Sequence, residues 1–223
     1  MTASTPVVLL HGFATSSART WGENGWLDLL ADAGRTTVPI DILGHGTAER
    51  PHDPAAYADL VGYVADRLPD EPVDAVGFSM GARLLLGVAA DQPGRFRRLV
   101  TLGVGRNLFE SSGDDVVIRA LEDGGDPANP VAAYFARLAA HPDADREALV
   151  ACLKAPLRLL TDEECARVTA PVLVVIGERD FAGPGDRLAG ALPDARLVVL
   201  PGADHFSTPK DFGAIDATLR FLD

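Results

Sequence analysis

The chain has 223 residues, of which 47% are hydrophobic and 23% charged, and its formal net charge is -12. This length suits one large domain or one domain with an insertion, and the apolar content excludes a disordered chain. The excess of acidic residues would repel a phosphate backbone, so we expect no nucleic-acid partner.

Short apolar runs alternate with helical patterns along the chain. Runs of Val, Ile and Leu of this length are typical of strands buried on both faces of a parallel sheet. The predicted strands are residues 6–10, 36–42, 73–77, 98–102, 172–176 and 197–200. The predicted helices of the same part of the chain are residues 26–33, 54–68, 80–90, 186–192 and 211–222. The alternation predicts an open α/β sheet with right-handed crossovers.

One gap between two predicted strands is too long for a plain crossover. It carries helical patterns over residues 131–140 and 146–153, and a stretch rich in Gly, Asp and Pro over residues 122–130 is typical of a loop. We therefore expect a small helical cap inserted into the α/β core. The predicted domains are a core of residues 1–105 and 170–223 and a cap of residues 106–169.

The strongest chemical signal is the sequence GFSMG at residues 77–81, which follows a predicted strand and precedes a predicted helix. In this context Ser79 would lie on a sharp turn with its hydroxyl exposed above the sheet. Gly77 and Gly81 are needed because side chains at these positions would collide with the turn. The N-terminus of the following helix favours developing negative charge, so the motif predicts that Ser79 is a nucleophile.

Two further residues follow the next strands in an order that suits acyl transfer. Asp180 ends the sequence GERD after one predicted strand, and His205 lies in GADHF after the next. Both would lie at the carboxyl ends of strands, where open α/β sheets bind ligands. Ser79, Asp180 and His205 can act as nucleophile, orienting acid and general base. Asp204 is a rival acid, but it adjoins His205 in sequence and its side chain is expected to point elsewhere.

The sequence HGF at residues 11–13 ends the first predicted strand. A hydrolase of this kind needs two backbone N–H groups near the nucleophile to hold an oxyanion. We expect Phe13 and Met80 to supply them. His11 and His45 each precede a glycine in a loop, and we expect both to be structural.

Together these motifs resemble the α/β-hydrolase superfamily. The matching pieces are HGF at 11–13, GHG at 44–46, GFSMG at 77–81, GERD at 177–180 and GADHF at 202–206. The resemblance spans nearly the whole chain, and it implies a triad of Ser79, His205 and Asp180 with no metal and no organic cofactor. The family usually has a β-hairpin before the strand that leads to HG, and the sequence leaves no room for it here. We therefore expect about six parallel strands rather than eight.

The predicted function is hydrolysis of a small carboxylic ester, or a related acyl compound, through an acyl-enzyme on Ser79. The string GFSMGAR, with HGF and Trp21, also resembles the branch that makes the menaquinone precursor SHCHC by eliminating pyruvate. In that branch an arginine four residues after the serine helps to hold a substrate carboxylate, which implies this role for Arg83. The triad would then act as a base, and no acyl-enzyme would form. The third alternative is a non-catalytic ligand-binding protein that kept the fold, but an intact triad argues against it.

The remaining features predict a cytoplasmic protein that acts on a small molecule. Cys152 and Cys165 form neither a disulfide framework nor a cluster with metal-ligand spacing. The apolar runs are too short to span a bilayer, so we expect no membrane insertion. The N-terminus shows no signal-peptide pattern, and reduced thiols are the default in the cytoplasm. The oligomeric state stays open.

Overall fold

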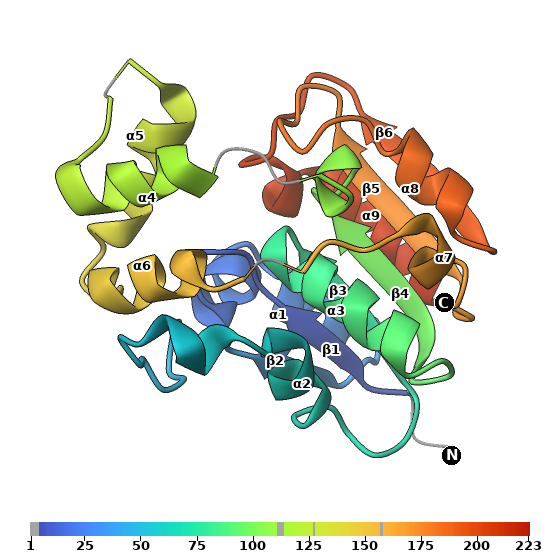
Figure 1. Cartoon of the computed structure of the whole chain (residues 1–223). Helices are drawn as coiled ribbons and strands as arrows, with labels where there is room; N and C mark the ends of the chain where they lie inside the picture. The colour runs from blue at the N-terminus through green and yellow to red at the C-terminus, as the bar shows by residue number, and fades with distance from the viewer. Residues whose placement is uncertain (1–4, 111–113, 127, 157) are drawn as a thin grey trace.

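The computed structural model describes residues 5–110, 114–126, 128–156 and 158–223, and its centre is a parallel sheet (Figure 1). The strands are β1 (Val7–Leu10), β2 (Thr37–Ile40), β3 (Val73–Phe78), β4 (Phe96–Leu102), β5 (Val172–Gly177) and β6 (Ala195–Leu200). They form one six-stranded sheet in the order β2-β1-β3-β4-β5-β6, and every neighbouring pair is parallel. The predicted parallel sheet of about six strands is confirmed.

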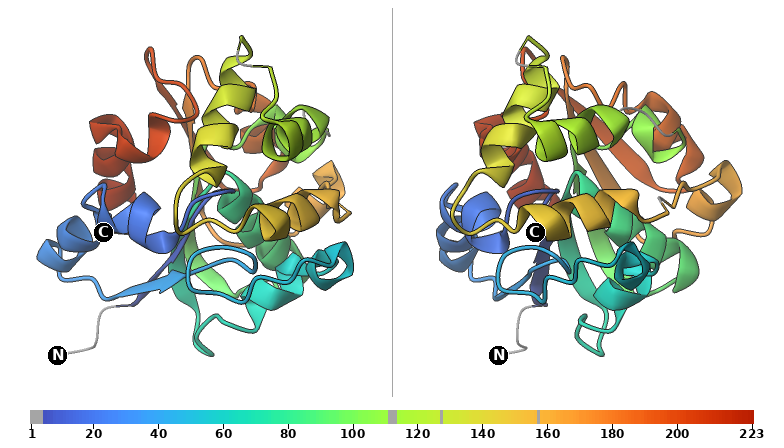
Figure 2. Two further views of the ribbon diagram at one scale, coloured as in Figure 1. Left: turned by 90° about the vertical axis from the view of Figure 1, so that its left-hand side faces the viewer. Right: turned by 60° about the vertical axis from the view of Figure 1, so that its left-hand side comes forward.

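Helices cover both faces of the sheet (Figure 2). One face carries α2 (Leu60–Ala65), α3 (Met80–Asp91), α7 (Asp162–Cys165) and α8 (Asp186–Ala191), and the other carries α1 (Trp26–Asp32) and α9 (Phe212–Leu222). Successive residues of β1 point to opposite faces of the sheet. Val8 and Leu10 pack against the helices of the first face, and Val7 and Leu9 against those of the second. All of β1 is buried, which explains why it reads as a continuous apolar run.

The prediction of a single helix over residues 54–68 is wrong. The structure has a 3-10 helix, η2 (Pro54–Tyr57), followed by the separate helix α2. Asp53 caps the first, because its carboxylate accepts the N–H of Ala55 at 2.9 Å. Asp59 then starts the second, because its carboxylate accepts the N–H of Gly62 at 2.7 Å. Aspartate competes with the helical backbone in this way, so an apolar periodicity that continues past it need not be one helix.

The second strand is also shorter than predicted, because residues 41 and 42 leave the ladder. The Asp41 carboxylate accepts the N–H groups of Ser17 and Thr47, each at 2.8 Å. These bonds tie the end of β2 to the loop after β1. A short π-helix in that loop, η1 (Ala18–Gly22), was not predicted.

The segment of residues 106–169, between β4 and β5, is mostly helical. It contains η3 (Arg106–Leu108), α4 (Asp114–Asp123), α5 (Pro130–Ala139), α6 (Arg146–Lys154) and α7. Figure 1 shows α4, α5 and α6 grouped beside one end of the sheet. The predicted helices α5 and α6 are confirmed, whereas α4 was not singled out and takes up the first two residues of the predicted loop. Residue 127 of that loop lies outside the described residues, and the domain bounds stay a prediction.

Both cysteines are buried free thiols, Cys152 in α6 and Cys165 at the end of α7. Burial raises the pKa of Cys152 to about 12 and that of Cys165 to about 11, so neither is a thiolate at neutral pH. Within the described ranges, no helix has the length and apolar character needed to cross a bilayer.

Candidate active site

Ser79 lies on the sharp turn between β3 and α3. Its backbone adopts φ 52° and ψ -115°, in a region that residues other than glycine rarely occupy. Its N–H donates to the carbonyl of Leu102 on the neighbouring strand β4 at 2.8 Å. Such strain persists only where the surrounding structure holds it, and it turns the Ser79 side chain outward from the carboxyl edge of the sheet.

The two glycines of the motif are required by close backbone contacts. A Cβ atom on Gly77 would lie 2.6 Å from the backbone N and Cα of Ala82. A Cβ atom on Gly81 would overlap the carbonyl oxygens of Leu10 and His11. Any side chain at Gly81 would therefore push α3 away from β1 and displace Ser79.

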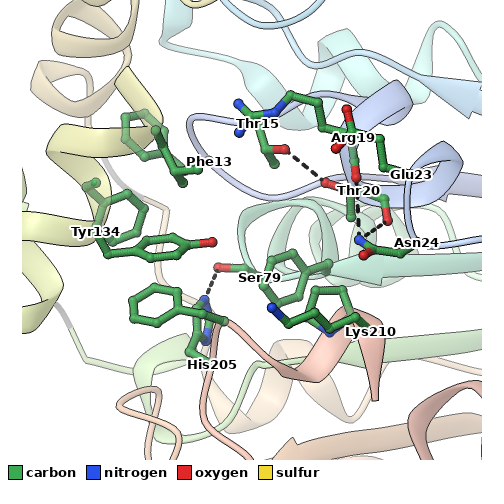
Figure 3. A pocket seen from close by; sticks show the side chains of 15 residues that line it. Phe13, Thr15, Arg19, Thr20, Glu23, Asn24, Ser79, Tyr134, His205 and Lys210 are labelled. Carbon is green, nitrogen blue, oxygen red and sulfur yellow. Dashed lines mark hydrogen bonds between the residues drawn. The ribbon is translucent and has the colours of Figure 1, made fainter. Parts of the chain in front are cut away.

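Ser79, His205 and Asp180 form a continuous hydrogen-bonded chain. Figure 3 shows its bond between Ser79 and His205. Ser79 Oγ lies 2.9 Å from His205 Nε2, and His205 Nδ1 lies 2.8 and 3.1 Å from the two carboxylate oxygens of Asp180. An ionised carboxylate only accepts, so His205 Nδ1 donates and Nε2 keeps its lone pair for the Ser79 hydroxyl. Asp180 is held in place by the N–H of Ala182, which donates to it at 2.8 Å. The structure thus brings together three side chains that the sequence places far apart.

The rival acid Asp204 is turned away from the imidazole. Its carboxylate accepts the N–H of Ser207 at 2.8 Å, and its own N–H donates to the Ser207 hydroxyl at 2.9 Å. Burial opposes ionisation of Asp204, but the hydrogen bonds from Ser207 outweigh it and lower the pKa of the carboxyl. Asp204 therefore stabilises the turn that carries His205.

Two backbone N–H groups are available beside Ser79. Met80 is the first residue of α3, so its N–H has no partner within the helix. Within the part of the chain that the structure describes, neither the N–H of Phe13 nor that of Met80 donates to a main-chain carbonyl. The loop that carries Phe13 approaches the nucleophile closely, since a Cβ atom on Gly12 would lie 3.4 Å from the Cβ of Ser79. Met80 thus adjoins Ser79, and the loop of Phe13 passes close to it, so both stay predicted donors to an oxyanion.

His11 fixes the start of this loop. Its Nδ1 donates to the carbonyl of Gly12 at 2.7 Å, and its Nε2 accepts the N–H of Ile42 at 3.1 Å. This pairing requires a neutral imidazole. Burial lowers the pKa of His11, against the raising effects of the Gly12 bond and the Asp41 charge. His11 therefore joins β1 to the end of β2, and it is structural as expected.

His45 should make the folded state sensitive to acid. It is 3% exposed, and its Nδ1 donates to the carbonyl of Leu43 at 3.0 Å. Its Nε2 has no hydrogen-bond partner among the described residues. Burial and the neighbouring His11 lower the pKa of His45 from 6.5 to about 3, although Asp41 opposes them. Between those pH values the unfolded chain binds a proton that the folded chain does not. The free energy of unfolding therefore falls as the pH falls, by about 1.4 kcal/mol per pH unit for this residue.

The measurement is urea unfolding at several pH values between about 6 and 4. His45→Asn keeps a donor near the Leu43 carbonyl and removes the titration, so its stability should decline less steeply with acid than that of the wild type. Equal slopes for the two proteins would contradict the assignment.

Ser79 and His205 open on a cavity of about 150 Å³ that has two different walls (Figure 3). The aromatic wall consists of Phe13, Tyr134, Phe135 and Phe206. Tyr134, from α5, stacks on Phe206 with the ring centroids 3.5 Å apart, so the 106–169 segment covers the site. The polar wall consists of Thr15, Arg19, Thr20, Glu23, Asn24 and Lys210.

Sequence reasoning missed most of these lining residues. Tyr134 lies within a helical pattern that says nothing of which face it presents. Arg19 and Lys210 follow the HGF and GADHF motifs at a short distance, and their position at the carboxyl edge of the sheet is the signal that could have found them.

Arg83 lies elsewhere. Its Nη1 donates to the carbonyl of Asn107 at 2.6 Å, and its Nη2 donates to that of Arg158 at 3.5 Å. It lines a separate cavity of about 140 Å³ formed by α3, residues 57–61 and residues of the 106–169 segment, together with Leu84 and Cys152. Residues four apart in a helix share one face, so Arg83 could have pointed to the side of Ser79. Its side chain instead extends toward the 106–169 segment, and the structure does not bring it into the cavity of Ser79.

Comparison with known proteins agrees with this architecture. Residues 7–215 match the model of a family described as "Alpha/beta hydrolase family". A pimeloyl-[acyl-carrier protein] methyl ester esterase of Neisseria meningitidis serogroup B is 31% identical, over 89% of this chain and 85% of that protein. A monoacylglycerol lipase of Mycolicibacterium smegmatis is 28% identical, over 97% and 87%. A Bacillus subtilis protein provisionally described as a 2-succinyl-6-hydroxy-2,4-cyclohexadiene-1-carboxylate synthase is 26% identical, over 96% and 89%.

Solved structures show the same fold at low sequence identity. The enol-lactonase of Burkholderia xenovorans LB400 superimposes with a TM-score of 0.75 at 23% identity, over 97% of this chain and 89% of that one. The 2-hydroxy-6-oxo-6-phenylhexa-2,4-dienoate hydrolase of Rhodococcus sp. strain RHA1 gives 0.74 at 21%, over 98% and 90%. Since the family model spans nearly the whole sequence and the sheet, its strand order and these neighbours agree, the chain belongs to the alpha/beta hydrolase family.

Proposed function

We propose that this chain is a serine hydrolase that cleaves a small carboxylic ester or a related acyl compound. The observation that carries the proposal is the hydrogen-bonded chain from Asp180 through His205 to Ser79, which ends at a cavity. The names of two relatives, a methyl ester esterase and a monoacylglycerol lipase, both describe ester cleavage and support it.

The first half of the reaction acylates the enzyme. Ser79 Oγ attacks the ester carbonyl while His205 Nε2 accepts the hydroxyl proton. Asp180 holds the imidazole in the required tautomer and stabilises the imidazolium that forms. The N–H groups of Phe13 and Met80 donate to the oxyanion of the tetrahedral intermediate. His205 then gives its proton to the departing alkoxide, which leaves as the alcohol.

The second half releases the acid. Water replaces the alcohol beside the imidazole, His205 removes a proton from it, and the resulting nucleophile attacks the acyl carbon. Collapse of the second tetrahedral intermediate breaks the acyl bond to Ser79, which recovers its proton from His205. Because the 106–169 segment covers the cavity, its aromatic residues restrict which acyl groups fit.

The test is a screen of 4-nitrophenyl esters of increasing acyl length, with mass spectrometry of protein quenched during turnover. We expect a mass increase equal to the acyl group on the peptide that contains Ser79. Turnover without any such adduct, even in rapidly quenched samples, would favour a route without an acyl-enzyme.

A lyase of the SHCHC synthase type is the second candidate, favoured by the description of the Bacillus subtilis relative. In that reaction the triad would act as a base on an anionic substrate and release pyruvate. The hydrogen bond from Arg83 to the Asn107 carbonyl weakens this alternative, because it occupies the side chain implied to hold the substrate carboxylate. The third candidate is a non-catalytic ligand-binding protein. Labelling of Ser79 by a fluorophosphonate would argue against this candidate.

The variant Arg83→Met should separate the two enzyme candidates. For an esterase, hydrolysis of neutral 4-nitrophenyl esters should stay within about tenfold of the wild type, a loss of at most about 1.4 kcal/mol in transition-state stabilisation. The reason is that Arg83 lines another cavity, where its guanidinium donates to the backbone carbonyls of Asn107 and Arg158. Rapid pyruvate release from the enolpyruvyl substrate by the wild type, and its loss in Arg83→Met, would instead support the lyase.

A further inference from the structure

Two cationic side chains, Arg19 and Lys210, line the cavity of Ser79 and form no ion pair with the described residues. Most of the 20 lysines and arginines bond to carboxylates or carbonyls or lie over aromatic rings. Arg97 bonds to the hydroxyl of Thr5. Arg19, Lys210, Arg119 and Arg146 make no side-chain contact of these kinds with the part of the chain that the structure describes. Arg119 and Arg146 are exposed on α4 and α6, whereas Arg19 and Lys210 both line the cavity that contains Ser79 and His205.

Arg19 is the more informative of the two, because it is half-buried. A cation that loses part of its hydration without gaining a partner is destabilising, unless something else supplies the missing contact. Its charge acts inside the cavity: burial raises the pKa of Tyr134 on the opposite wall, and the charges of Arg137 and Arg19 oppose this rise. The guanidinium is therefore placed to meet a group bound between the two walls (Figure 3).

The charges of the lining select the kind of anion. Arg19 and Lys210 contribute two positive charges and Glu23 one negative charge, so the ionisable side chains of the polar wall leave one positive charge uncompensated. A single carboxylate balances it, whereas a doubly charged phosphate would not. The chain as a whole is strongly acidic, at -12, so a local excess of positive charge is not a property of the general surface.

We propose that the substrate ester carries a carboxylate, which Arg19 binds with the assistance of Lys210. The inference rests on the proposed ester hydrolysis and specifies its substrate class. The aromatic wall packs against the hydrocarbon part of the ester, and the polar wall holds the carboxylate, with the reacting carbonyl at Ser79 between them. A guanidinium suits this role because its planar N–H groups can bind both oxygens of one carboxylate.

The test compares matched pairs of esters that differ in one carboxylate. Monoethyl adipate against ethyl hexanoate places the charge on the acyl side, and 4-acetoxybutyrate against butyl acetate places it on the alcohol side. We expect kcat/KM of the wild type to favour the charged member of at least one pair by about tenfold or more, mainly through KM. This preference should weaken as salt is added, because part of the site is open to solvent.

Variants assign the preference to the proposed residues. In Arg19→Met the ratio of kcat/KM for the charged ester to that for the neutral ester should fall to about one. Arg19→Lys should restore part of the preference, because it returns the charge without the planar donor group. Arg146→Met is the matched control, because it removes an arginine that also has no partner in the described ranges, lies on α6 and lines a different cavity. It should keep the wild-type ratio. A wild type with no preference in either pair, or a preference that survives in Arg19→Met, overturns the proposal.

A binding measurement separates this inference from the proposed function. If neutral esters are hydrolysed and no charged ester is preferred, the carboxylate site is wrong and the esterase assignment stands. If no ester is hydrolysed, NMR titration of Ser79→Ala with the same four esters still decides the inference. The carboxylate site is supported if the charged member of a pair binds with a dissociation constant about tenfold lower, and if this preference is lost in the double variant that also carries Arg19→Met. Equal constants overturn it.

Discussion

Replacing Ser79 by alanine should lower kcat/KM for 4-nitrophenyl esters by at least about 10⁴-fold, because no other group of the cavity can replace the nucleophile. The hydroxyl lines the cavity and lies 2.9 Å from His205 Nε2, so its removal deletes the attacking atom and leaves the base intact. The residual rate then comes from substrate binding and from the N–H groups of Phe13 and Met80. Initial rates at matched protein concentrations measure the loss.

The fold should survive this change. Ser79 is only partly buried, and alanine tolerates the turn about as well as serine does, so the free energy of unfolding should change by no more than about 1 kcal/mol. Ser16→Ala is the matched control: Ser16 Oγ accepts the N–H of Arg19 at 3.3 Å in the loop after β1, outside the cavity of Ser79. It should keep its activity and its fluorophosphonate labelling. An adduct on Ser16, or an active Ser79→Ala protein, would refute the assignment of the nucleophile.

The parts of the site that the sequence predicts are those fixed by backbone geometry. The turn at Ser79 needs glycine at residues 77 and 81, since any side chain would collide with Ala82 or with β1. Asp180 and His205 follow buried strands, and an all-parallel sheet places every such residue at one edge. Local sequence therefore determines both the turn and the edge at which the residues meet.

The parts that it does not predict depend on side-chain direction and on packing across the chain. The helical pattern over residues 131–140 predicts α5, but only the packing of α5 against residues 13 and 206 turns Tyr134 into the cavity. Arg83 shows the opposite case. Its position four residues after Ser79 matches the motif, but the carbonyl of Asn107, from a distant loop, directs its guanidinium into another cavity. A second helix cap at Asp59 likewise divided a helix whose apolar pattern is continuous.

Asp180→Asn is the second variant expected to have a large effect. The asparagine amide can donate to Nδ1 of His205. The imidazole would then carry its proton on Nε2, and Nε2 could no longer accept the proton of the Ser79 hydroxyl. The Ser79 hydroxyl would then lack a base, and the imidazolium would lack its carboxylate 2.8 Å away. We expect kcat to fall by about 10³- to 10⁴-fold with a smaller change in KM, measured with the same 4-nitrophenyl esters.

Asp204→Asn tests whether the effect comes from the carboxylate at the imidazole or from any negative charge near it. Asp204 adjoins His205 in sequence, but its carboxylate bonds to the N–H of Ser207, and asparagine can accept the same bond. This variant changes the charge near the site by the same amount as Asp180→Asn, so a general electrostatic effect would lower both activities alike. We expect Asp204→Asn to stay within about tenfold of the wild type, a difference of about 1.4 kcal/mol. If Asp204→Asn were the inactive variant and Asp180→Asn the active one, the orienting acid would be Asp204, and His205 would have to rotate away from Asp180 during the reaction.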